Sequence, residues 1–73
     1  SIENTFIQKQ RRKKIINAID SLKPKFKEVI IMYEIQDMSY EEISEKLKVP
    51  LGTIRSRLFN ARKELSEKLQ DLI

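Results

Sequence analysis

The stretch from Ser39 to Lys63 constrains the fold most, because it predicts a short helix, a tight turn and a second, basic helix. Ser39–Glu42 fits a capping box: the serine hydroxyl can accept from the amide of Glu42, and the Glu42 carboxylate from the amide of Ser39. The first helix is expected to end near Leu47. Lys48–Pro50 supplies the break, because proline cannot continue a helix but tolerates the start of the next one.

The second helix of this pair carries an apolar stripe on one face and a basic, hydrogen-bonding surface on the other. The stripe recurs at steps of three and four residues, through Leu51, Ile54, Leu58, Ala61, Leu65, Leu69 and Leu72. At about 100° per residue, the opposite face carries Gly52, Ser56, Phe59, Asn60 and Lys63, flanked by Arg55 and Arg62 on one side and Arg57 on the other. From residue 51 to 63 there are four basic side chains and no acidic one. Such a helix suits the major groove of DNA.

The composition excludes several classes of function. The 73 residues make one small domain, with no cysteine and no histidine, so disulfides, ordinary zinc sites and nucleophile–histidine catalysis are excluded. A single glycine leaves no phosphate-cradling loop. No apolar run approaches the roughly 20 residues that cross a membrane, and no secretory signal is visible. We therefore expect no enzyme, no cofactor, no metal and no membrane contact.

The charge is distributed unevenly along the chain. The net charge is +4, with six basic and two acidic residues in 1–23, four and six in 24–50, and five and three in 51–73. Basic ends around an acidic middle point to an oriented contact with a polyanion.

The first 22 residues predict a tail and one helix. We expect Ser1–Ile7 to be a frayed tail or linker remnant, and the absence of an initiator methionine favours an excised domain at 8–73. Gln8–Leu22 predicts a helix with Ile15, Ile19 and Leu22 on one face. Its run Lys9–Lys14 has five basic residues in six. That run is a solvated helical face, a DNA backbone contact or a basic linker to a preceding domain.

A second helix is predicted from Pro24 to about Gln36. The residue before a proline avoids the α region, which ends the first helix at Lys23. The main apolar face of the second helix is Phe26, Val29, Ile30 and Tyr33, and Ile31, Met32 and Ile35 widen it until it nearly encircles the helix. Central burial is favoured over docking of a partner. With short loops and no strand-like alternation, the fold class is an all-α, four-helix domain containing a helix-turn-helix.

From Leu22 to Leu65 the chain resembles region 4, the C-terminal DNA-binding domain of bacterial RNA polymerase sigma factors of the extracytoplasmic-function type. The resemblance rests on three segments: Leu22–Ile30 (LKPKFKEVI), Met38–Ser44 (MSYEEIS) and Val49–Arg62 (VPLGTIRSRLFNAR). Regulators of the quorum-sensing or response-regulator type share the first half of the motif, but they typically lack the serine–arginine pair.

The resemblance implies a function and partners. Such domains recognise the −35 promoter element in double-stranded DNA and dock on the β flap of RNA polymerase core, and anti-sigma factors often occlude them. It implies a cytoplasmic monomer that directs transcription initiation without catalysis of its own. Two positions depart from the family pattern. Lys48 stands where glycine is common in the turn, and Asn60 stands where arginine is common, so the promoter sequence of relatives should not be transferred to this chain.

Nine residues are candidates for DNA contact: Gly52, Thr53, Arg55, Ser56, Arg57, Phe59, Asn60, Arg62 and Lys63. The amides near Gly52 and Thr53 lie at a helix N-terminus and favour a phosphate, although both residues also suit a turn. Arg55 and Ser56 are placed for base edges or nearby phosphates. Arg57 is expected to bind the backbone or an acidic side chain in the helix 39–47.

Four of the nine candidates, Phe59, Asn60, Arg62 and Lys63, lie toward the end of this surface. Phe59 either packs on a thymine methyl or sugar, or bends back over the helix 39–47. Arg62 and Lys63 take phosphates or stay solvated.

Three other classes of function remain open at this point. The same motif occurs in effector domains of regulators that bind palindromes as dimers. A protein-interaction bundle with a merely solvated basic face, and a basic helix lying on a membrane surface, are the others.

Overall fold

The computed structural model describes residues 2–70 of the chain. Its α-helices are α1 (Ile2–Asp20), α2 (Pro24–Ile30), α3 (Tyr40–Leu47) and α4 (Leu51–Gln70), and α2 continues directly into a π-helical turn, η1 (Ile31–Ile35). The described part of the chain contains no strand. The predicted all-α class is therefore confirmed, and α3, its turn and α4 form the helix-turn-helix.

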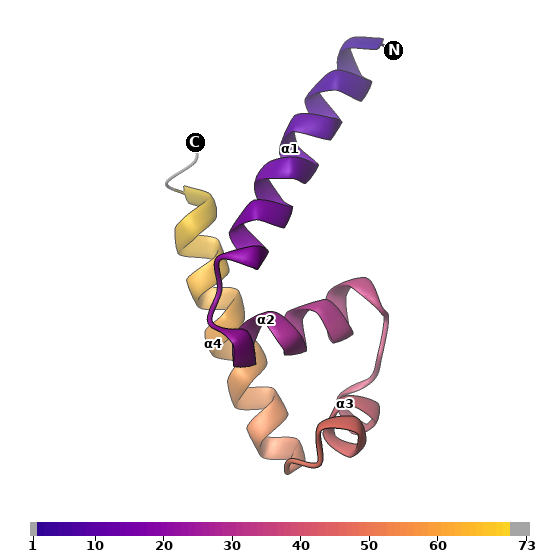
Figure 1. The fold of residues 1–73 in the computed structure, drawn as a ribbon, viewed down its shortest axis with the longest axis vertical. Helices are drawn as coiled ribbons and strands as arrows, with labels where there is room; N and C mark the ends of the chain where they lie inside the picture. The colour runs from indigo at the N-terminus through magenta and orange to yellow at the C-terminus, as the bar shows by residue number, and fades with distance from the viewer. Residues whose placement is uncertain (1, 71–73) are drawn as a thin grey trace.

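The long helix α4 is the element on which the other helices assemble. It contacts α1, α2 and α3; α2 crosses its middle, and α3 lies at its N-terminal end (Figure 1). Most of α1 extends away from this body, which gives the molecule its elongated dimensions of 44 × 24 × 15 Å. The predicted central position of the second helix is confirmed for Val29, Ile30 and Met32, which are buried against α1 and α4, but Ile35, which was predicted to widen the same buried stripe, is exposed.

The core is a single apolar cluster between these helices. Its buried members are Ile19, Leu22, Val29, Ile30, Met32, Ile43, Ile54, Leu58 and Ala61. No polar or charged residue of the described part is buried. The stripe predicted on α4 is confirmed at Ile54, Leu58 and Ala61, and Leu51, Leu65 and Leu69 are half-buried. Leu72 lies outside the described residues.

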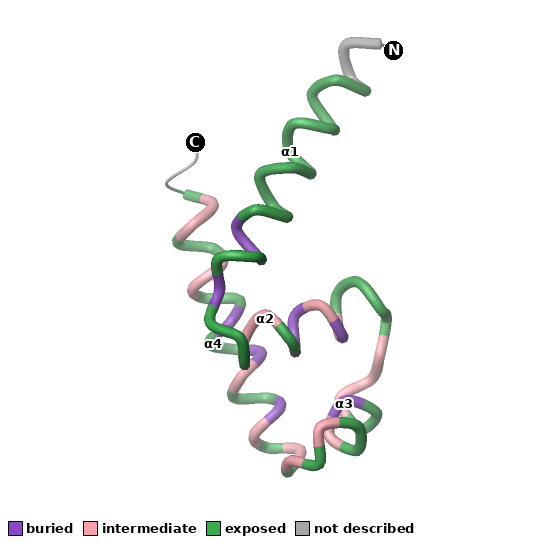
Figure 2. Tube along the Cα trace, viewed as in Figure 1, coloured by how far each residue is buried: buried purple, intermediate pink, exposed green. Residues whose placement is uncertain are grey.

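Helix α1 spans Ile2–Asp20, whereas the sequence predicted a helix from Gln8 to Leu22. It begins at Ile2 rather than Gln8, because no proline or glycine interrupts the chain before Pro24. The division into a tail, 1–7, and a domain, 8–73, stays a prediction. Every side chain from Thr5 to Asn17 is exposed, including Ile15 at 41%, which was predicted to share the buried face (Figure 2). No helix of the described residues is long and apolar enough to span a bilayer.

The widened turn η1 ends the second helix. The amide of Gln36 donates to the carbonyl of Ile31 at 3.0 Å, a step of five residues instead of the four of an α-helix. Asp37 follows with φ of 55° and turns the chain toward α3. The sequence predicted the extent of this helix, to about Gln36, but not its change of winding.

The capping box predicted at the start of α3 is present. The amide of Ser39 donates to Glu42 Oε1 at 2.8 Å, and the amide of Glu42 donates to Ser39 Oγ at 3.0 Å. The hydrogen bond from the Ser39 backbone, followed by that with its side chain, holds the pKa of Glu42 below its usual value. The box fixes where α3 begins, and with it the position of Tyr40.

The turn between α3 and α4 depends on a left-handed residue. Lys48 has φ of 57° and ψ of 45°, the conformation that most non-glycine residues avoid. The amide of Val49 donates to the carbonyl of Ser44 at 3.2 Å, and the Ser44 hydroxyl donates to the carbonyl of Val49 at 2.5 Å. Pro50 then accepts from the amides of Thr53 and Ile54. Together these hydrogen bonds fix the direction in which α4 leaves the turn.

Replacing Lys48 by glycine is expected to stabilise the domain by about 1 kcal/mol, because glycine adopts positive φ without the steric cost that a side chain carries. For a domain of this size, that corresponds to a rise in melting temperature of roughly 4–8 °C. Thermal unfolding followed by circular dichroism measures it. Lys46→Gly, two residues earlier and inside α3, is the matched control and should destabilise instead. A fall in melting temperature for Lys48→Gly contradicts the argument.

Candidate nucleic-acid interface

The outward face of α4 gathers the candidate residues predicted from the sequence. The exposed members are Gly52, Arg55, Ser56, Phe59, Asn60, Arg62 and Lys63, and the half-buried ones are Thr53 and Arg57. The buried stripe Ile54–Leu58–Ala61 anchors this helix on its other side. The sequence therefore placed the polar and apolar faces of α4 correctly; the DNA contacts themselves remain predictions.

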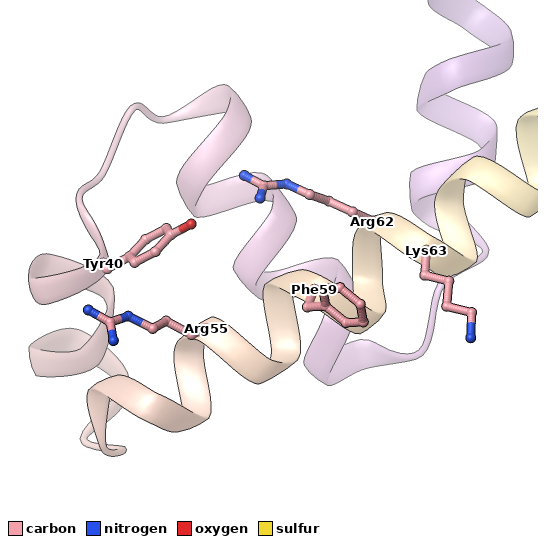
Figure 3. A pocket seen from close by; sticks show the side chains of 5 residues that line it. All are labelled: Tyr40, Arg55, Phe59, Arg62 and Lys63. Carbon is pink, nitrogen blue, oxygen red and sulfur yellow. The ribbon is translucent and has the colours of Figure 1, made fainter.

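A hollow of about 460 Å³ lies on this face, at the corner between α3 and α4. Arg55, Phe59, Arg62 and Lys63 line it from α4, and Tyr40 lines it from the start of α3 (Figure 3). Its walls are thus three cationic side chains and two aromatic rings. Such a combination suits a polyanion that also presents apolar groups or base faces.

Phe59 extends into solvent at this hollow. Its exposed fraction is 69%, the largest among the exposed large hydrophobic residues of the described chain. The alternative in which its ring bends back over the helix 39–47 is not realised. The ring is therefore available to a partner, and its packing on a DNA group stays a prediction.

Asn60 faces a neighbouring hollow on the other side of Lys63. That second hollow, of about 410 Å³, is lined by Lys23, Phe26, Asn60, Lys63, Glu64 and Glu67. Lys63 lines both hollows, so it lies where they adjoin. The acidic pair Glu64 and Glu67 bounds the basic surface of α4 toward the C-terminus.

Gly52 stands in the first turn of α4 without a structural need for glycine. Its φ is not positive, and a Cβ added there would meet no other atom within 4 Å. The space in front of this position is therefore open. Close approach of a phosphate to the amides at the N-terminus of α4 is consistent with that opening.

Arg62 has partners inside the domain that the sequence did not reveal. Its Nη2 and Nε donate to Glu34 Oε1 at 3.0 and 3.3 Å, and its guanidinium carbon lies 5.1 Å from the centre of the Tyr33 ring. Burial acts to lower the pKa of Arg62, but the hydrogen bonds to Glu34 and the nearness of the Glu34 carboxylate and the Tyr40 hydroxyl outweigh it and raise the pKa. The sequence placed Arg62 only at the flank of the outward face of α4. That position does not identify Glu34, 28 residues away, as its partner.

Tyr40 and Arg57 complete the description of the site. Tyr40 was missed as a site residue because it follows the Ser39 cap in an otherwise acidic turn; its ring lies 5.0 Å from that of Tyr33. Arg57 forms no ion pair with the acidic side chains of α3 in the described structure, so one of its two predicted partners is not found. The described residues contain no cluster of acidic or histidine side chains that could hold a metal ion.

Comparison with known proteins shows the family of the chain, and the match extends over α2, η1, α3 and most of α4. The family model described as "Sigma-70, region 4" matches residues 12–65. The ECF RNA polymerase sigma-E factors of Escherichia coli (strain K12) and Salmonella typhimurium (strain LT2) are 37% identical to this chain over 71 residues, which is 97% of it and 37% of each relative. That of Haemophilus influenzae is 34% identical, over 97% of this chain and 38% of the relative. The chain thus spans less than two fifths of the length of these relatives.

Proposed function

The chain belongs to the sigma-70 region 4 family, and from that premise we propose that it recognises the −35 element of promoters as one domain of an alternative sigma factor. In this role it directs transcription initiation in the cytoplasm as a monomer and catalyses no reaction itself. The observation that carries the proposal is the outward face of α4, where four cations and no acid stand between residues 51 and 63 above a fully buried stripe.

The N-terminal half of α4 enters the major groove in this proposal. Gly52 and Thr53 bring backbone amides to a phosphate at the helix N-terminus, where the open space before Gly52 admits it. Arg55 and Ser56 read base edges, and Arg55 pairs with a guanine through two hydrogen bonds. These assignments are supported by the exposure of Gly52, Arg55 and Ser56.

The second half of the surface holds the duplex in register. Asn60 suits adenine, and Phe59 packs on a thymine methyl or a sugar. Arg57 and Lys63 bind phosphates, and Arg62 belongs to the same surface through the hollow that it lines. This division into base contacts and phosphate contacts can be tested residue by residue.

A second surface suits the polymerase. The exposed fractions of Ile16 on α1 and Ile35 on η1 are 55% and 59%, and with Ile31 these residues line a small apolar groove of about 120 Å³. We place the dock for the β flap of RNA polymerase core here, and an anti-sigma factor that covers this groove or α4 would block the domain. The groove leaves the DNA-facing side of α4 free, so both partners can bind at once.

The alternative function is the effector domain of a dimeric regulator of the quorum-sensing or response-regulator type, which shares the helix-turn-helix. Neither the family match nor the relatives favour it. A symmetric duplex that binds two copies of the domain would support it over the sigma-factor function.

An amide chemical-shift titration of the labelled domain tests the proposal. We expect a duplex with an AAC-containing −35-like element to shift resonances of residues 51–63, and a scrambled duplex to shift them less and only at low salt. Amides of residues 5–8 of α1, which precede the basic run Lys9–Lys14, serve as the internal control and should stay unmoved. If no amide of α4 shifts with either duplex at low salt, the domain is not a promoter reader.

A further inference from the structure

The contacts of Arg62 join three elements at the edge of the DNA-facing hollow. Its guanidinium meets Glu34 of η1 through two nitrogens and lies over the neighbouring Tyr33 ring. Tyr33 in turn contacts Tyr40, the first residue of α3, with ring centres 5.0 Å apart and planes tilted by 48°. η1 therefore presents two consecutive side chains to one guanidinium of α4, and Glu34 forms no ion pair with any other cation of the described structure.

These contacts occupy part of the guanidinium with which an arginine binds a phosphate. Nε and Nη2 both donate to one oxygen of Glu34, Oε1, so the side of the fork that these two nitrogens form is directed at a carboxylate inside the domain. The planar face is occupied by Tyr33. Moving Arg62 to DNA would leave Glu34 unpaired next to a phosphate backbone of the same sign, which is unfavourable. Lys63, the next residue, is exposed and has no ion-pair partner in the described structure.

The group that this arrangement holds in place is Tyr40. It lines the hollow opposite Phe59, and its ring extends from α3 between Arg55 and Arg62 (Figure 3). The Tyr33 ring, which lies under the Arg62 guanidinium, packs directly against the Tyr40 ring, and Arg62 and Tyr40 line the same hollow. A substitution at Arg62 is therefore expected to move Tyr40, which lines the hollow together with Arg55, the residue proposed to contact bases.

We propose that Arg62 is a positioning residue: with Glu34 and Tyr33 it forms a clamp that fixes Tyr40 beside Arg55, and it thereby sets the sequence preference of the domain without binding phosphate itself. The inference rests on the proposed promoter recognition for its effect on DNA, but the clamp exists in the free protein. Glu34 thereby becomes a specificity-determining residue, although its negative charge is repelled by the phosphates of DNA.

The test compares Arg62→Gln, Glu34→Gln and the double variant on matched and scrambled duplexes over a range of salt concentrations. A clamp predicts that each single variant lowers the ratio of matched to scrambled affinity by about fivefold, and that the double variant loses no more than either single variant. The slope of log K against log salt should stay unchanged for Arg62→Gln. Both single variants should also move the Tyr40 ring resonances by a similar amount in the absence of DNA.

A phosphate contact predicts the opposite pattern. In that case Arg62→Gln weakens both duplexes equally and reduces the salt slope by about 0.9, while Glu34→Gln frees the guanidinium and tightens both complexes. Either result overturns the clamp. Lys63→Ala is the positive control for a lost phosphate, and Lys27→Gln, which removes the exposed Asp20–Lys27 ion pair elsewhere, controls for loss of a surface pair without a link to the hollow.

Failure of the two proposals can be told apart. If the native domain binds neither duplex, promoter recognition fails, and the Tyr40 resonances of the free variants still decide whether the clamp exists. If DNA binding is normal but the Tyr40 resonances do not respond to Glu34→Gln, the clamp alone is wrong.

Discussion

Ile54→Ala is expected to leave the isolated domain largely unfolded at 37 °C. Ile54 is fully buried in the core cluster, in the second turn of α4. Truncation of a buried isoleucine costs roughly 2–5 kcal/mol, whereas the core of a domain this small supplies a net stability of only about 3–5 kcal/mol. The loss is therefore of the same size as the total. Far-UV circular dichroism with urea titration at 10 and 25 °C measures it.

Ile35→Ala is the matched control for this prediction. The chemical change is the same, but Ile35 is 59% exposed on η1, so its effect should stay within about 0.5 kcal/mol. A urea midpoint for Ile54→Ala that remains close to the native value would mean that the stripe of α4 does not support the fold. The direction in which α4 presents its basic face would then need another cause.

The features that the sequence predicted best are local ones. The Ser39–Glu42 box, the break at Lys48–Pro50 and the stripe through Ile54 and Leu58 each follow from residues within one or two helical turns. At that range, side-chain chemistry and helix periodicity determine the geometry almost alone. The same range covers the whole recognition unit, which is why its fold and its exposed face follow from the order of its residues.

The features that the sequence missed depend on distant parts of the chain. Periodicity shows that Ile15 shares a face with Ile19, but not that the body of the domain ends before it reaches Ile15. The pairing of Arg62 with Glu34 spans 28 residues and depends on how η1 packs beside α4. In η1 a backbone hydrogen bond spans five residues instead of the four of an α-helix, and no single residue of the segment specifies that change.

Arg55→Ala is expected to remove most of the sequence preference of DNA binding. Arg55 is exposed at the hollow, beside Tyr40, and it belongs to the half of α4 that follows the turn. A bidentate arginine–guanine contact is worth roughly 1–3 kcal/mol of discrimination, which is about 5- to 150-fold in affinity for the matched duplex. Fluorescence anisotropy with labelled matched and scrambled duplexes at two salt concentrations measures both the affinity and its salt dependence.

Lys63→Ala separates this base contact from the general attraction of the basic face. Lys63 is expected to meet a phosphate, so its loss should weaken matched and scrambled duplexes alike and reduce the salt slope by about 1. Arg55→Ala should instead weaken chiefly the matched duplex. If Arg55→Ala costs the same on both duplexes, Arg55 does not read a base, and sequence preference must come from Ser56, Asn60 or the shape of the duplex. Because both variants remove one positive charge from exposed positions of the same helix, a difference between them cannot arise from net charge.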